Sequence, residues 1–304
     1  MSKPRSPEMK RLLMFVLGAC LASGSRAFDF GGASDITAVS GRTSREYVRT
    51  RLANGSFAPE SYVFGKGGAR SGAMQDASID KLDFLDVAHV IAGPLASQNY
   101  LPSTDPKTTR LLIMVYWGTT QAPEHANETA GMQNLQSAQD ALNNAQAQGL
   151  QSTSPARQSL EGQFTTAMAL VQAENKMRDQ ADLVNVKMLG YDSWWDESQG
   201  DHRGTAFALS RKDLVDEIEQ NRYFVVLMAY DFQIAWKDKK HSLLWETRFS
   251  IRQRHHEFDK DLPVLAQYAS RYFGQDSNGL IRGAVPLGHV DIGEVKSLGE
   301  VPGK

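Results

Sequence analysis

The chain has one cysteine, Cys20, among 304 residues. A disulfide within the chain needs two thiols and a cysteine-type zinc site needs several, so the sequence excludes both. Net charge is also low, with a formal value of −2. We therefore do not expect nucleic acid as a partner, because phosphate binding depends on clustered Lys and Arg. Without disulfides the fold depends on its core, for which a hydrophobic content of 41% is sufficient.

The first 27 residues carry the pattern of an export signal. Positive charges near the start precede a short apolar core from Leu12 to Ala22, and Ser25 and Ala27 supply the small residues of a cleavage site after Ala27. This core is about 11 residues long, whereas a helix that spans a bilayer needs roughly 20. We expect export to the periplasm or the extracellular space, with a formal net charge of −6 once residues 1–27 are removed.

Cys20 offers an alternative interpretation of the same segment. The string Leu17-Gly18-Ala19-Cys20 resembles the lipobox of bacterial lipoproteins, in which the cysteine is lipidated and becomes the mature N-terminus. The chain would then be an outer-membrane lipoprotein that contacts the membrane only through its lipid. Against this, a start at Met9 leaves a short apolar core before Cys20. The sequence leaves both outcomes open, and the mass of the mature N-terminus distinguishes them.

The rest of the chain predicts one domain with an insertion. We expect an N-terminal arm at 28–57 with an edge strand near Glu46, a single domain at 58–278 and an irregular tail at 279–304. Residues 121–190, rich in Gln, Ala, Asn and Ser, predict an inserted helical hairpin that turns near 149–155. The expected fold is α+β: a mixed or antiparallel sheet of four to five strands, two helices on one face, and this inserted hairpin.

Two of the predicted strands have different hydrophobic patterns. Residues 111–117 are continuously apolar, which is typical of a strand covered on both faces. Residues 243–251 alternate, which predicts one buried face that includes Trp245 and one solvated face.

Two blocks of the chain resemble a family of small bacterial envelope lipoproteins of unknown function. The first is the helical segment that ends at 95–100 together with the strand at 111–117. The second runs from 225–231 through Leu244-Trp245-Glu246 to a helix that ends at Tyr272-Phe273-Gly274. The resemblance covers about a third of the chain and implies a strand, a helix, a strand and a Trp-bearing hairpin. It supplies no catalytic residues, and the insertion at 121–190 departs from the family pattern.

The sequence contains no clear catalytic or metal-binding motif. It has no Gly-x-Ser-x-Gly, and once Cys20 is removed or lipidated no thiol is left to act as a nucleophile. His255-His256-Glu257 is the one histidine cluster, and we interpret it as a solvated charged turn rather than a metal site. We expect no cofactor and no metal.

One group of residues suggests ligand binding. Tyr116, Trp117, Thr119 and Thr120 combine aromatic faces with hydroxyls at the end of a strand, and Asp192, Trp194 and Trp195 are expected to line the same depression. Such a site suits a sugar or a peptide. The alternative is that the tryptophans only seal the hairpin against the sheet.

The function expected from these features is binding rather than catalysis. We predict an exported envelope protein without enzymatic activity, whose partner is an envelope protein or a cell-wall component and whose contact surface is the hairpin at 121–190. The alternative is a hydrolase that acts on an envelope polymer through carboxylates near Thr119 and Thr120.

Overall fold

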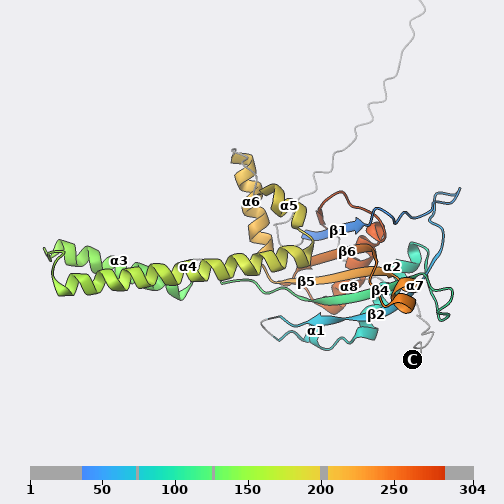
Figure 1. The fold of residues 1–304 in the computed structure, drawn as a ribbon, viewed down its shortest axis with the longest axis horizontal. Helices are drawn as coiled ribbons and strands as arrows, with labels where there is room; N and C mark the ends of the chain where they lie inside the picture. The colour runs from blue at the N-terminus through green and yellow to red at the C-terminus, as the bar shows by residue number, and fades with distance from the viewer. Residues whose placement is uncertain (1–35, 73–74, 125–126, 199–204, 285–304) are drawn as a thin grey trace, which may run out of the picture. The chain divides into compact units, whose positions relative to one another are not determined.

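The structure is a computed structural model that describes residues 36–72, 75–124, 127–198 and 205–284. Its centre is a seven-stranded sheet with the strand order β3-β2-β4-β5-β6-β1-β7 (Figure 1). The strands are β1 (Ile36–Thr43), β2 (Glu60–Arg70), β3 (Tyr100–Pro102), β4 (Leu111–Thr119), β5 (Arg222–Asp231), β6 (Leu243–Arg252) and β7 (Ile281–Ala284). β2 is parallel to β3 and β4 and the other pairs are antiparallel, so the sheet is mixed.

Helices pack on both faces of this sheet. They are α1 (Ala77–Asp80), α2 (Phe84–Ser97), α3 (Ala130–Ala147), α4 (Pro155–Leu189), α5 (Asp192–Ser198), α6 (Thr205–Ile218), α7 (Phe232–Asp238) and α8 (Phe258–Ala269), which runs into the short 3-10 helix η2 (Ser270–Tyr272). One core lies between the sheet and helices α2 and α8. A second core lies between the opposite face and the C-terminal turns of α4 with α6.

Strand β5 shows how one strand serves both cores. Val225 and Leu227 belong to the core under α2 and α8, whereas Phe224 and Val226 belong to the core under α4 and α6. Successive side chains of a strand point to opposite faces, so a continuous apolar run is needed when both faces are covered. In β6 the face predicted to be buried is buried, and its Trp245 is 1% exposed, but the face predicted to be solvated is largely covered, since Ser250 on it is 0% exposed.

The predicted sheet of four to five strands with helices on one face was wrong. The structure is α+β, but the sheet has seven strands and both of its faces carry helices. β1 lies in the segment predicted as an arm, but earlier in the chain than the edge strand expected near Glu46, where the structure has no strand, and β7 comes from the segment predicted as an irregular tail. Both sequences are poor in large apolar residues, so these strands are stabilised by pairing with their neighbours more than by a hydrophobic pattern of their own.

Helices α3 and α4 form a hairpin within residues 121–190, and they lie side by side in Figure 1. Ser154 caps the start of α4 by accepting a hydrogen bond from the Arg157 N–H, and Gly190 ends it in the left-handed conformation. Small buried residues lie along the seam, namely Ala138 and Ala145 of α3 and Ala167 of α4. In the described part of the chain, no helix is both long enough and apolar enough to cross a bilayer.

Candidate functional site

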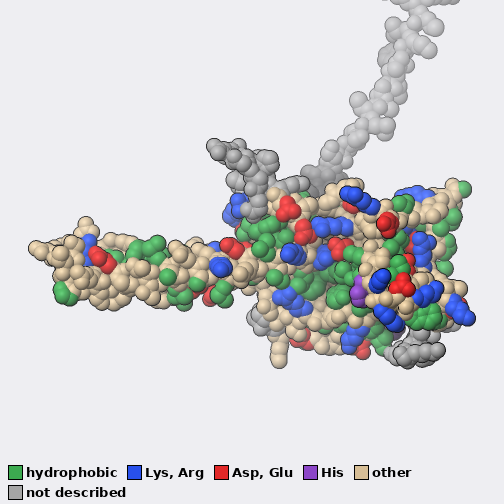
Figure 2. All heavy atoms as spheres, viewed as in Figure 1, with side chains coloured by type: hydrophobic (Ala, Val, Ile, Leu, Met, Phe, Trp, Pro, Cys, Tyr) green, Lys and Arg blue, Asp and Glu red, His purple; other side chains and the backbone are tan. Residues whose placement is uncertain are grey.

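A groove lies where the C-terminal part of α4 crosses the sheet, and we call it the α4 groove. Its volume is about 520 Å³. It is lined by Gly68, Ala69 and Arg70 of β2, Tyr116 and Trp117 of β4, Val184, Lys187 and Met188 of α4, Phe224, Val226 and Met228 of β5, and Arg248 of β6. Figure 2 shows hydrophobic side chains over the middle of the sheet beside the end of α4, with Lys and Arg among them.

The groove is open because α4 covers only part of this sheet face. In β4, Leu111, Ile113 and Val115 are fully buried under α2 and α8, whereas the alternate positions are only half-buried. The interpretation of 111–117 as a strand covered on both faces was therefore wrong for the α4 side. The incomplete cover leaves apolar side chains such as Tyr116 of β4 and Met228 of β5 facing the groove.

Glycine in β2 gives the floor of the groove its shape. A Cβ at Gly67 would lie 2.7 Å from the ring of Tyr116, so the missing side chain lets that ring lie across β2. The register of β2 with β4 shifts between Lys66 and Gly68, which marks a bulge-like irregularity at the edge of the groove. Bulges re-aim strand side chains and are common beside binding sites.

Three basic residues line the groove. Arg248 pairs with Glu246 at 2.9 Å and donates to the Lys187 carbonyl oxygen at 2.8 Å. Arg70 lies 3.8 Å from the Met188 sulfur and forms no ion pair with any residue that the structure describes. Lys187 is exposed in the last turn of α4. The groove therefore combines an apolar floor with positive charge.

The residues predicted to line one ligand site lie in several different places. Tyr116 faces the α4 groove, and Trp117 also lines it although its side chain is 2% exposed and belongs to the core under α2 and α8. Thr119 is buried near Gly72. Thr120 is buried too, and its hydroxyl donates to the Gln220 carbonyl oxygen at 3.1 Å and accepts from the Arg222 N–H at 2.9 Å.

The other three predicted residues lie around α5. Asp192 pairs with Arg42 of β1 at 3.1 Å. Trp194 and Trp195 pack against the core under α4 and α6, and the Arg282 guanidinium lies 5.1 Å from the Trp194 ring centroid. Both tryptophans therefore cover the core, which is the alternative that the sequence left open. Cys20 and Ala27, the candidate lipidation and cleavage positions, lie outside the described residues.

Sequence reasoning missed most of the groove. Val184, Lys187 and Met188 fall within the hairpin predicted at 121–190 but were not singled out, and neither was Arg70. One signal was available in the sequence. The C-terminal turns of α4 carry apolar residues next to basic ones, a composition that suits the wall of a binding groove.

A carboxylate does lie near the Thr119 edge, since Thr119 pairs with Tyr223 of β5 and the Tyr223 hydroxyl bonds to Asp76. One Asp76 oxygen accepts from the Tyr223 hydroxyl and, at 2.7 Å, from the Gln253 amide, while the other accepts from the Ser78 hydroxyl and N–H at 2.7 and 2.9 Å. Burial opposes ionisation, but these hydrogen bonds outweigh it and lower the pKa of Asp76. Burial, together with the bond to Asp76, raises the pKa of Tyr223 to about 12.

Both oxygens of Asp76 are thus occupied by structural hydrogen bonds that cap α1 and tie it to β5. A general base needs a free lone pair directed at substrate. Asp76 is therefore an anchor in this structure, and the hydrolase alternative stays a prediction.

The histidine cluster is only partly solvated. His255 is exposed with φ +69°, but the side chain of His256 is buried and its Nδ1 lies 2.9 Å from a carboxylate oxygen of Asp261 at the start of α8. The interpretation as a solvated turn was wrong for His256. Among the residues with defined positions, no three His, Cys, Asp or Glu side chains gather as a metal site would require.

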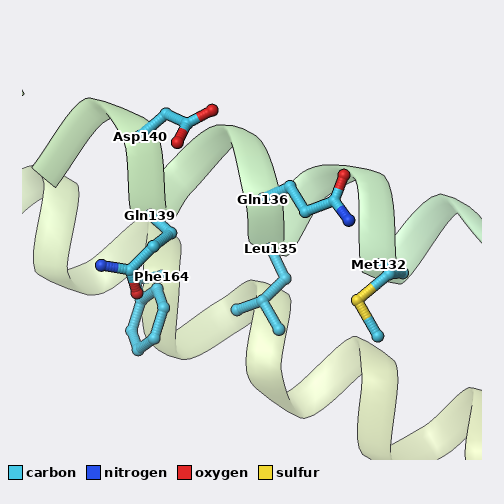
Figure 3. Close-up of a pocket in the computed structure, with 6 residues that line it drawn as sticks. All are labelled: Met132, Leu135, Gln136, Gln139, Asp140 and Phe164. Atoms are coloured by element: carbon cyan, nitrogen blue, oxygen red, sulfur yellow. The ribbon is translucent and has the colours of Figure 1, made fainter. Parts of the chain in front are cut away.

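A second hollow lies along the hairpin, with a volume of about 490 Å³. Figure 3 shows Met132 and Leu135 pointing from α3 toward α4, with Phe164 of α4 beside Gln139. Two helices alone cannot bury these side chains completely, since each covers only one side of the other. This hollow lies within the contact surface predicted at 121–190, which stays a prediction.

Comparison with known proteins assigns no family. No family model matches the chain, and no curated protein matches it. A crystal structure of a PDZ domain protein from Parabacteroides distasonis is similar at 8% sequence identity with a TM-score of 0.35. The match covers 82% of this chain and 39% of that chain, so this chain spans about two fifths of its length. A likeness at this TM-score does not establish a shared fold.

Proposed function

We propose that this chain is a binding protein without enzymatic activity and that the α4 groove holds its ligand. The single observation that carries the proposal is the open, apolar groove of about 520 Å³ beside the C-terminal part of α4, whose lining includes Arg70 and Lys187, neither of which pairs with a carboxylate of the described residues. Ligand sites in proteins are concave, usually 300–1,000 Å³ in volume, and mostly apolar with a few polar groups that fix orientation. The groove has these properties.

The proposed place of action is the cell envelope. Support for it comes from the export pattern of residues 1–27, with either cleavage after Ala27 or lipidation of Cys20. The partner would then be an envelope component, and the hairpin at 121–190 is the alternative contact surface. A mature N-terminus at Met1 in the native protein would contradict this part of the proposal.

The α4 groove can be tested by filling it from α4. Val184 lines the groove and is 45% exposed, so Val184→Trp adds bulk there without entering a buried core. Leu183, its neighbour on the same helix, is 43% exposed and does not line the groove, so Leu183→Trp is the matched control. The probe is phenylnaphthylamine, a neutral apolar dye excited beyond tryptophan absorption.

We expect the parent chain and Leu183→Trp to bind the dye with dissociation constants within about twofold of each other, and Val184→Trp to bind it at least about tenfold more weakly. Thermal unfolding of all three checks that the fold is retained. Equal binding by the two variants, or no binding by the parent chain, would contradict the proposed site.

A further inference from the structure

The cations that line the α4 groove differ in what holds them. The Arg248 guanidinium already has partners within the protein. It pairs with Glu246 at 2.9 Å and donates to the α4 carbonyl oxygens of Lys187 and Met188 at 2.8 and 3.4 Å. These bonds satisfy the C-terminal end of α4 and fix it on β6. Arg248 is therefore part of the wall of the groove.

Arg70 and Lys187 do not pair with a carboxylate of any described residue. Arg70 is half-buried at the end of β2, and within the described part of the chain its guanidinium has one polar contact, the weak acceptor sulfur of Met188 at 3.8 Å. Lys187 is exposed on α4 and forms no ion pair with any described residue. Among the described residues that line the groove, none carries a carboxylate. A ligand with a negative charge would complement these two cations.

The floor of the groove excludes ligands that are polar along their length. β4 and β5, which form the middle of the floor, are paired on both sides, so their backbone groups are used within the sheet, whereas Gly68, Ala69 and Arg70 of β2 pair on one side, with β4. A peptide or a sugar laid on this floor would leave N–H, C=O or O–H groups without partners, at a cost in free energy for each. A hydrocarbon chain has no such groups, and Met188 and Met228 offer flexible side chains that adapt to it.

We propose that the ligand of the α4 groove is a fatty carboxylate, an inference that rests on the proposed function. Its hydrocarbon chain lies on the floor beside Tyr116 and Met228, and its carboxylate is bound by Arg70 and Lys187. The planar guanidinium of Arg70 can donate two parallel hydrogen bonds to a carboxylate, and Lys187 adds a point charge. This replaces the sugar or peptide that the sequence alone suggested.

The test compares two dyes that differ by one charge. Dansylaminoundecanoate carries a fatty carboxylate, and its methyl ester is neutral. We expect the intact chain to bind the carboxylate about tenfold more tightly than the ester. The variant Arg70→Gln/Lys187→Gln should lose that preference while its affinity for the ester stays within about twofold.

Lys66→Gln/Lys107→Gln is the control, because it removes the same net charge from two exposed positions that do not line the groove. It should keep the tenfold preference, and unlabelled dodecanoate should displace the bound carboxylate dye. Equal affinity for the two dyes, with binding of both abolished by Val184→Trp, would overturn the fatty carboxylate and leave the groove as the site. Absence of binding for both dyes would overturn the proposed function itself.

Discussion

Gly274→Ala is expected to lower the free energy of unfolding by about 2–4 kcal/mol. Gly274 follows η2 with φ +67°, in the left-handed region that favours glycine. A Cβ there would overlap the hydroxyl of Tyr100. Tyr100 cannot move aside easily, because it is fully buried and its hydroxyl bonds to the Tyr47 hydroxyl at 3.2 Å and to the Phe273 carbonyl oxygen at 3.3 Å. Denaturant unfolding measures the loss.

Two comparisons separate the overlap from the backbone effect. Gly55 also has positive φ, at +85°, but a Cβ there meets no atom within 4 Å, so Gly55→Ala should cost no more than about 1 kcal/mol. In a Tyr100→Phe background the hydroxyl is gone, and Gly274→Ala should cost clearly less than in the parent chain. An equal cost in both backgrounds would show that the Tyr100 hydroxyl does not limit this position.

Trp245→Ala is expected to lower the free energy of unfolding by about 3–5 kcal/mol. Trp245 is 1% exposed at the centre of the core under α2 and α8. Its ring stacks on Phe273 with 6.1 Å between centroids and lies 5.6 Å from the Tyr100 ring. Replacing it with alanine removes the contacts of a large ring and leaves a cavity that these neighbours cannot fill.

Trp236→Ala is the matched control, because Trp236 in α7 is 43% exposed. Its loss should cost less than about 1 kcal/mol. Denaturant titration followed by circular dichroism measures both variants without relying on tryptophan fluorescence. Similar losses for the two variants would show that Trp245 is not at the centre of the core.

The local pattern of the sequence predicted the strands and helices that have strong hydrophobic periodicity. β6 is an example, because alternate apolar residues placed Trp245 on a buried face and the structure confirms it. β1 and β7 escaped prediction because pairing partners distant in the chain, rather than their own residues, make them strands. Strand number depends on such long-range pairing, which no local pattern reports.

Of the seven residues predicted to line one ligand site, Tyr116 and Trp117 do line the α4 groove. Tyr116 was singled out as an aromatic residue at a strand end, and it does face the α4 groove. The grouping with Thr120 and Trp194 failed, because Thr120 is buried in hydrogen bonds to the backbone of Gln220 and Arg222 and Trp194 packs against the core under α4 and α6. Where the sheet face is left uncovered depends on how far α4 extends over it, and that is a property of packing between elements.

The central claim is that the ligand binds in the α4 groove rather than on the hairpin, and the methyl signals of methionine test it most directly. Met188 and Met228 line the α4 groove, Met132 lines the hairpin hollow, and Met177 on α4 is 69% exposed outside both. With methyl-labelled methionine, and each signal assigned by a Met→Leu variant, NMR follows a titration with dodecanoate. We predict saturable shifts at Met188 and Met228, with Met132 and Met177 unchanged. Shifts at Met132 without shifts at Met188 and Met228 would contradict the claim.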